Sequence, residues 1–209
     1  MRAAVLHELG TPRYDEFDEP RAGAGQAVVD VAAAGLNPID VNKAAGRFYA
    51  GPPDLPSVTG MEGVGTLAGG RRVYFMDSVA PFGSMAERAV IEESRAIDVP
   101  DGVDDGTAVA LGIAGLAAWL ALEWRARLGE GETVLVLGAT GTVGLVAVQA
   151  AKLLGAGRVI AAGRDAGGLQ RAEEAGADAT VSLKEKDLAA AFSDAAQGRL
   201  DVIVDPLWG

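Results

Sequence analysis

The sequence predicts a two-domain α/β protein, and three observations support that fold class. Residues 1–103 hold short apolar runs separated by Gly and Pro clusters, a pattern typical of a β-rich barrel or sandwich. Residues 104–128 are rich in alanine and have a helical composition. Residues 129–209 alternate strand-like and helix-like segments, which implies a parallel sheet with helical crossovers.

In the first domain, three segments have the pattern of strands: residues 27–31, 72–75 and 87–91. Asn37 and Pro38 begin a short helical segment, which the proline-rich loop 48–56 terminates. Phe48 and Tyr49 in this loop either line a pocket or cover the open end of a barrel, and the sequence leaves both alternatives open.

Residues 104–128 are expected to link the domains through helices that break near Gly112 and Gly115. In the last domain, the expected order is strand 133–137, helix 142–154, strand 158–162, helix 166–175, strand 179–182, helix 185–196 and strand 201–205. A six-stranded dinucleotide fold would need two more strands, so we expect a sheet that is incomplete at the C-terminus, in a truncated chain.

The segment TVLVLGATGTVG organises this last domain. An unbroken apolar run ends at Gly138, Gly141 and Gly144, whose three-residue spacing permits a sharp turn, approach of a ligand and close packing of the following helix. The N–H groups of the first helical turn, on Thr142, Val143 and Gly144, and the positive end of the helix dipole favour a pyrophosphate. With a second strand and a polar turn about 20 residues further on, the pattern predicts a Rossmann-type dinucleotide site.

The turn Gly163-Arg164-Asp165 at the end of that second strand bears on the choice of cofactor. The guanidinium of Arg164 offers a planar fork suited to a phosphate, which favours NADPH. Asp165 either caps the next helix or holds the ribose, and the second alternative would favour NAD.

Composition excludes several classes of function. A net charge of -11 and a pI of about 4.5 argue against nucleic-acid and anionic-membrane partners. The sequence has no cysteine and a single histidine, His7, so we expect no metal site and no thiol chemistry. Without a secretory signal or an apolar stretch of 18 residues, the protein is expected to be cytoplasmic.

The whole chain resembles the zinc-free branch of the medium-chain dehydrogenases/reductases, the quinone oxidoreductase type. The segments that carry this resemblance are AAGLNPIDVNKAAG, LPSVTGMEGVG, GSMAE, IAGLAAW, LGATGTVG, VIAAGRD and DVIVDPLWG. The resemblance implies a GroES-like substrate domain over residues 1–103 and a partial Rossmann domain over residues 129–209.

The resemblance also implies roles for individual residues. Asn37 and Met61 stand where the zinc enzymes of the superfamily have a cysteine and a histidine ligand. Asp40 and Glu62 match acidic positions that both branches share, with roles in structural hydrogen bonding near the cleft. Asn37 and Tyr49 would border the nicotinamide, so Asn37, Asp40 and Tyr49 are the candidate catalytic residues. The chain departs from many relatives in having Ala117 in place of a threonine beside the cofactor.

The implied activity is NADPH-dependent reduction of quinones or α,β-unsaturated carbonyls by hydride transfer without a metal. These electron-poor acceptors need less Lewis-acid assistance than alcohol oxidation does. The alternatives are an enoyl-thioester reductase and a non-catalytic NADPH-binding protein. Relatives are commonly dimers, so a full-length form is expected to be a homodimer.

Overall fold

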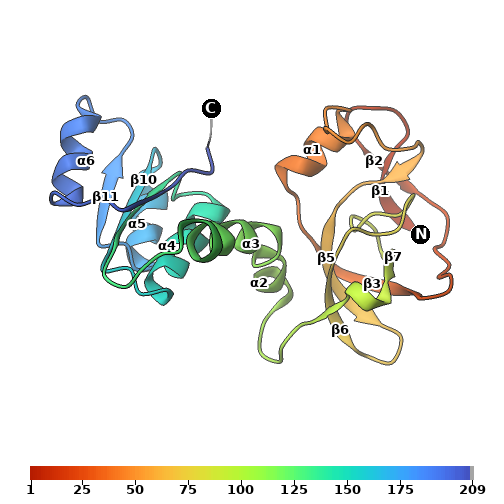
Figure 1. Cartoon of the computed structure of the whole chain (residues 1–209). Coiled ribbons are helices and arrows are strands. Elements are labelled where there is room, and N and C mark those ends of the chain that lie inside the picture. Colours follow the sequence, from red (N-terminus) through yellow and green to blue (C-terminus); the bar gives the residue numbers. More distant parts are fainter. Residues whose placement is uncertain (208–209) are drawn as a thin grey trace. The chain divides into compact units, whose positions relative to one another are not determined.

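The computed structural model describes residues 1–207 and divides into two units between Gly112 and Ile113 (Figure 1). The helical stretch 104–128, predicted as a separate link, is divided at this point between the two units. The segment DVIVDPLWG, which carries part of the resemblance, ends in two residues, Trp208 and Gly209, that lie outside the described residues. No helix within residues 1–207 has both the length and the apolar character needed to cross a bilayer.

The first unit is rich in short strands. Its elements are β1 (Arg2–Leu6), β2 (Arg13–Glu16), β3 (Gln26–Ala34), α1 (Pro38–Ala44), β4 (Ser57–Val58), β5 (Glu62–Leu67), β6 (Arg72–Met76), β7 (Arg88–Glu92), the 3-10 helix η1 (Glu93–Arg95), β8 (Ile97–Asp98) and α2 (Asp105–Ala110). They confirm the three predicted strands and the short helix after Asn37.

Two antiparallel sheets form this unit, one with the strand order β7-β3-β5-β6-β8 and one with the order β2-β1-β4. Strand β5 lies in the middle of the larger sheet, yet it contains Gly63 and Gly65. A Cβ at either glycine would overlap atoms of β3, the neighbouring strand. The close approach of the two strands therefore excludes larger residues at these positions.

The second unit contains α3 (Ile113–Leu120), the π-helix η2 (Ala121–Ala126), β9 (Thr133–Leu137), α4 (Thr142–Leu153), β10 (Arg158–Gly163), α5 (Ala166–Glu174), β11 (Ala179–Ser182), α6 (Leu188–Ala196) and β12 (Val202–Val204). This order confirms the predicted alternation of strands and helices. Helix α6 begins three residues later than predicted because the side chain of Asp187 caps it, accepting from the N–H of Ala190 at 3.0 Å.

The predicted break at Gly115 is wrong, although a break does occur near Gly112, between α2 and α3. Helix α3 continues through Gly115, which is buried in it. A small buried residue is compatible with an unbroken helix where neighbouring elements pack closely, and α3 packs against α4.

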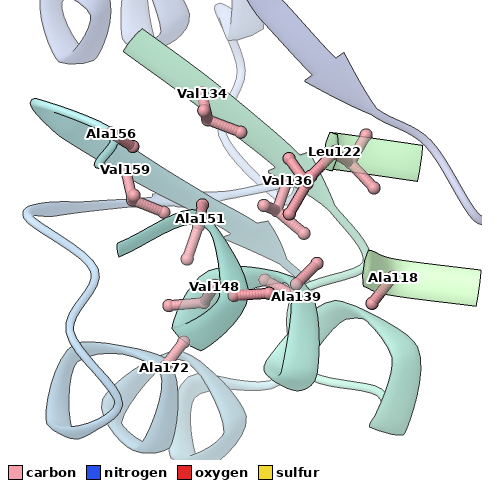
Figure 2. Close-up of a cluster of buried hydrophobic side chains, with 14 residues drawn as sticks. Ala118, Leu122, Val134, Val136, Ala139, Val148, Ala151, Ala156, Val159 and Ala172 are labelled. Atoms are coloured by element: carbon pink, nitrogen blue, oxygen red, sulfur yellow. The ribbon is translucent and has the colours of Figure 1, made fainter. Parts of the chain in front are cut away.

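The four strands of the second unit form a parallel sheet with the order β11-β10-β9-β12. Figure 2 shows one face of it, where Val134, Val136 and Val159 of the strands meet Val148 and Ala151 of α4. The buried alanines of this helix allow a close approach between the helix and the sheet. On the opposite face, the apolar side of α6 packs against β9, β10 and β11.

Asp178 ties three elements of this unit together just before β11. Its Oδ2 accepts from the Nζ of Lys152 on α4 and from the N–H of Val159 on β10, each at 2.6 Å. Burial raises the pKa of Asp178, but the Lys152 ammonium and the Val159 N–H outweigh it, and the pKa lies below its usual value.

We predict that Asp178→Asn lowers the free energy of unfolding at pH 7 by about 1–3 kcal/mol, the usual scale for a hydrogen bond to a charged group. A lowered folded-state pKa contributes stability above the unfolded-state pKa, and this contribution is lost as the pH falls through the folded-state pKa. The difference between variant and parent should therefore shrink in acid. Denaturant titrations from pH 7 to pH 3 measure this, with the exposed Glu185→Gln as the control, and a pH-independent difference would contradict the assignment.

Candidate functional site

The glycine turn after β9 is built by close contacts between backbone atoms. Gly138 has a φ of +67°, a conformation that favours glycine, and a Cβ at Gly144 would overlap the carbonyl oxygen of Gly138. Gly141 differs, because the nearest atom to a Cβ built there is the Gly138 oxygen at 3.6 Å. Gly138 and Gly144 thus serve the turn itself, whereas a side chain at Gly141 would make only an ordinary van der Waals contact.

Helix α4 begins at this turn with unpaired donors. Its N-cap, Gly141, has no side chain to accept from the first turn. The N–H groups of Thr142, Val143 and Gly144 form no hydrogen bond to any atom of residues 1–207. Together with the helix dipole, these donors can hold the oxygens of a pyrophosphate.

Strand order places this turn where ligands bind in parallel sheets. From β9 the chain proceeds to β10 and β11 on one side and then returns to β12 on the other, so the order reverses beside β9. The side chain of Leu207, which follows β12, lies against Gly138. The predicted glycines and the end of β12 therefore meet at one edge of the sheet.

Two residues after the end of β10 bear on the choice of cofactor, and they differ in their contacts. Asp165 caps α5, its Oδ2 accepting from the N–H of Gly168 at 2.6 Å. Arg164 is exposed and forms no hydrogen bond or ion pair with the rest of residues 1–207. Gly163 is required for packing, since a Cβ there would overlap the side chain of Thr140.

Lys184 is a second cation that follows the end of a strand at this edge of the sheet, and it was not among the predicted site residues. Gly163 pairs with Ser182 in the parallel register of β10 and β11, so Arg164 and Lys184 follow adjacent strand ends. Lys184 is exposed, and its N–H donates to the Oγ of Ser182 at 3.3 Å. Strand pairing, which the local sequence does not show, is the signal that finds it.

The first unit brings two of the three candidate catalytic residues together at the start of α1. Asn37 is the N-cap of α1 and forms a capping box with Asp40, whose Oδ2 accepts from the Asn37 N–H at 2.8 Å. Tyr49 is not part of this group. It is 93% exposed, and its ring lies 4.4 Å from that of Phe48.

Asp40 is a buried acid with an unsatisfied oxygen. Its side chain is 5% exposed, and its Oδ1 has no hydrogen-bond partner among the described residues. Burial raises the pKa of Asp40, although the N–H groups of Asn37 and Met61 act against the shift.

Asp40 also lines a pocket of about 420 Å³ within the first unit. Phe48 and prolines of the loop 48–56 supply apolar surface, and Lys43 and the unpaired Oγ of Ser78 supply polar groups. Of the two alternatives for the loop aromatics, Phe48 follows the first, because it lines a pocket. Tyr49 is not among the residues that line this pocket. Within residues 1–207, no three His, Asp or Glu side chains gather into a group that could hold a metal ion.

Two family models match this chain, one within each of its two units. Residues 23–101 match the alcohol dehydrogenase GroES-like domain, and residues 142–207 match the zinc-binding dehydrogenase family. The quinone oxidoreductase-like protein 2 homolog of Nematostella vectensis is 31% identical over 221 residues, which cover 100% of this chain and 60% of that protein. The chain therefore spans about three fifths of the length of this relative.

Two solved structures share the fold along the whole chain. The quinone oxidoreductase of Thermus thermophilus, described together with its NADPH complex, has 33% identity and a TM-score of 0.86, with 100% of this chain and 68% of that chain covered. A probable oxidoreductase from Mycobacterium abscessus has 33% identity and a TM-score of 0.89, with 100% and 70% covered.

We predict that Gly144→Ala destabilises the second unit by about 1–3 kcal/mol, the scale of overpacking, because the new methyl group meets backbone atoms of Gly138 and Ala139. Gly141→Ala is the matched control at the same turn, where the φ of -91° and a nearest atom at 3.6 Å from the new Cβ admit a side chain. Its expected loss is at most about 1 kcal/mol, for an altered N-cap. Thermal unfolding of both variants measures this, and equal losses would contradict the close contact at Gly144.

We predict that Asp40→Asn becomes more stable than the parent as the pH rises. A folded-state pKa above the unfolded-state value gives stability that is present below the unfolded-state pKa and lost as the pH rises through the folded-state pKa. The asparagine keeps an acceptor for the Asn37 N–H and carries no buried charge. Denaturant titrations from pH 3 to pH 8 should show the gain growing from about pH 4 upward, and a gain that shrinks over this range would refute the assignment.

Proposed function

The chain belongs to the medium-chain dehydrogenase/reductase family, quinone oxidoreductase type, and we propose that it reduces quinones or α,β-unsaturated carbonyls with NADPH. The observation that carries the choice of cofactor lies at the end of β10. There Asp165, the acid that would accept from a ribose, caps α5 instead. The guanidinium of the neighbouring Arg164 has no partner among the described residues. The NADPH complex of the Thermus relative supports the same choice.

The residues of the glycine turn would hold the cofactor by its pyrophosphate. The N–H groups of Thr142, Val143 and Gly144 would donate to the phosphate oxygens, and Gly141 would leave room for them to approach. Arg164 and Lys184 would flank the 2′-phosphate from adjacent strand ends. NADH lacks that phosphate, so these two side chains would favour NADPH.

When bound, NADPH supplies a hydride, and one further proton completes the conversion of a quinone to a hydroquinone and NADP⁺. We assign the first unit the task of orienting the acceptor and meeting the charge that develops on its oxygen. Asn37 would border the nicotinamide. The exposed phenol of Tyr49 can donate to an acceptor oxygen, and so can the Asp40 carboxyl in its protonated form.

The pocket beside α1 is the candidate place for the acceptor. Its size suits a small ring compound, and its lining combines Phe48 and prolines with charged side chains that include Asp40 and Lys43.

We predict that Arg164→Ala weakens NADPH binding by about 1–3 kcal/mol, because a charge-assisted contact to the phosphate is lost, and leaves NADH binding nearly unchanged. Calorimetric titration of both cofactors measures the effect, and the exposed Arg125→Ala is the matched control for removing one positive charge. Equal losses for the two cofactors would overturn the assignment of Arg164.

The activity itself is tested by following NADPH oxidation after addition of 1,4-benzoquinone to the unaltered chain. We expect turnover that stops when the quinone is consumed, with hydroquinone formed in equal amount. Tight NADPH binding without turnover on quinones and enones would refute the reductase proposal and favour a protein that only binds the cofactor.

A further inference from the structure

A buried carboxylate that the proposed reaction does not use lies next to Asn37. Glu62, at the start of β5, is 2% exposed. Its Oε1 accepts from the Nδ2 of Asn37 at 2.7 Å, and its Oε2 accepts from the hydroxyl of Tyr74 on β6, also at 2.7 Å. Each oxygen of this acid therefore receives a side-chain donor from a different element.

The backbone at two glycines lies close against the carboxylate of Glu62. A Cβ at Gly35 would overlap Oε1, and a Cβ at Gly112 would overlap Oε2 and the ring of Tyr74. The N–H of Gly35 also donates to the carbonyl oxygen of Glu62 at 3.0 Å. Glycine at both positions therefore lets the backbone enclose the carboxylate, whose position is set by packing as well as by hydrogen bonds.

An enclosed carboxylate can only accept hydrogen bonds, so it distinguishes the two ends of an amide. The NH₂ group of Asn37 can face Glu62, whereas its carbonyl oxygen would be repelled. Burial and the contact with Glu62 raise the pKa of Tyr74, which keeps the phenol protonated as a donor. Tyr74 thus donates to the second oxygen, and Asn37 donates to the first.

We propose that Glu62 is the positioning residue for Asn37: through the Oε1 contact it fixes the orientation of the Asn37 carboxamide, and through Asn37 it fixes the start of α1. The proposal rests on the proposed function only where it assigns Asn37 to the nicotinamide. A carboxamide held in one orientation presents its remaining hydrogen-bonding groups to a ligand without the cost of ordering them.

The two asparagines of the chain make a direct test possible. Selective ¹⁵N-asparagine labelling gives side-chain NH₂ signals from Asn37 and the exposed Asn42 alone, and Asn42 serves as an internal control. In Glu62→Met, which keeps the length of the side chain and removes both acceptors, we expect solvent exchange of the Asn37 NH₂ to quicken by at least about tenfold. Glu62→Gln, which can still accept from Asn37, should keep exchange slow, and so should Tyr74→Phe.

Activity gives the second measurement. With NADPH and 1,4-benzoquinone, Glu62→Met should lower kcat roughly 10- to 100-fold, the scale for a misplaced group, and Glu62→Gln should restore most of it. In the Asn37→Ala background, Glu62→Met should cause no further loss, because the two residues act as one.

The two measurements separate failure of this inference from failure of the proposed function. Unchanged exchange of the Asn37 NH₂ in folded Glu62→Met would overturn the positioning role, and so would losses in kcat that multiply in the double variant. If the unaltered chain shows no turnover, the proposed function fails, and the exchange rates still decide the role of Glu62.

Discussion

The second unit depends on how closely α4 approaches the turn that follows β9. The backbone at Gly144 lies against the Gly138 carbonyl with no room for a side chain, and buried alanines continue the close packing along the helix. This contact brings the first helical turn to the carboxyl edge of the sheet and directs its N–H groups away from the core. The same atoms therefore build the core of the unit and form its candidate phosphate site.

The first unit is organised around acids that it keeps from water. Asp40 and Glu62 are both buried. A backbone N–H donates to Asp40, and an amide and a phenol donate to Glu62. Burying a carboxylate is costly unless its oxygens are hydrogen-bonded. Glu62 has a side-chain donor on each oxygen, whereas one oxygen of Asp40 has no partner among the described residues. The first acid is suited to holding a neighbour in place, and the second is suited to gaining a proton.

Much of the second unit could be predicted from local sequence. Unbroken apolar runs and the alternation of strand-like and helix-like segments placed its strands and helices within a few positions, because a parallel sheet buries each strand on both faces. The glycine turn could also be predicted, because the spacing of its glycines is set by contacts between residues that are close in the sequence. Arg164 could be selected for the same reason, as it directly follows a strand.

Features that depend on strands distant in sequence could not be predicted in this way. Strand β5 was not predicted. Its two glycines are required by close contacts with β3 and β6, and glycine is not typical of the strand pattern in a sequence. The contact between Tyr74 and Glu62 needs the pairing of β5 with β6, and the neighbourhood of Arg164 and Lys184 needs the register of β10 with β11. The exposure of Tyr49 likewise depends on the path of the loop 48–56, which local composition does not set.

The central claim, that the glycine turn and the end of β10 bind NADPH, is tested most directly by titrating the uniformly ¹⁵N-labelled chain with NADPH and recording its backbone amide spectrum. The account predicts that the largest shifts occur at residues 139–145, at Arg164 and at Lys184, and that NADH reproduces the shifts at the turn but not those at the two cations. Shifts confined to other residues, or no shifts at millimolar NADPH, would contradict it.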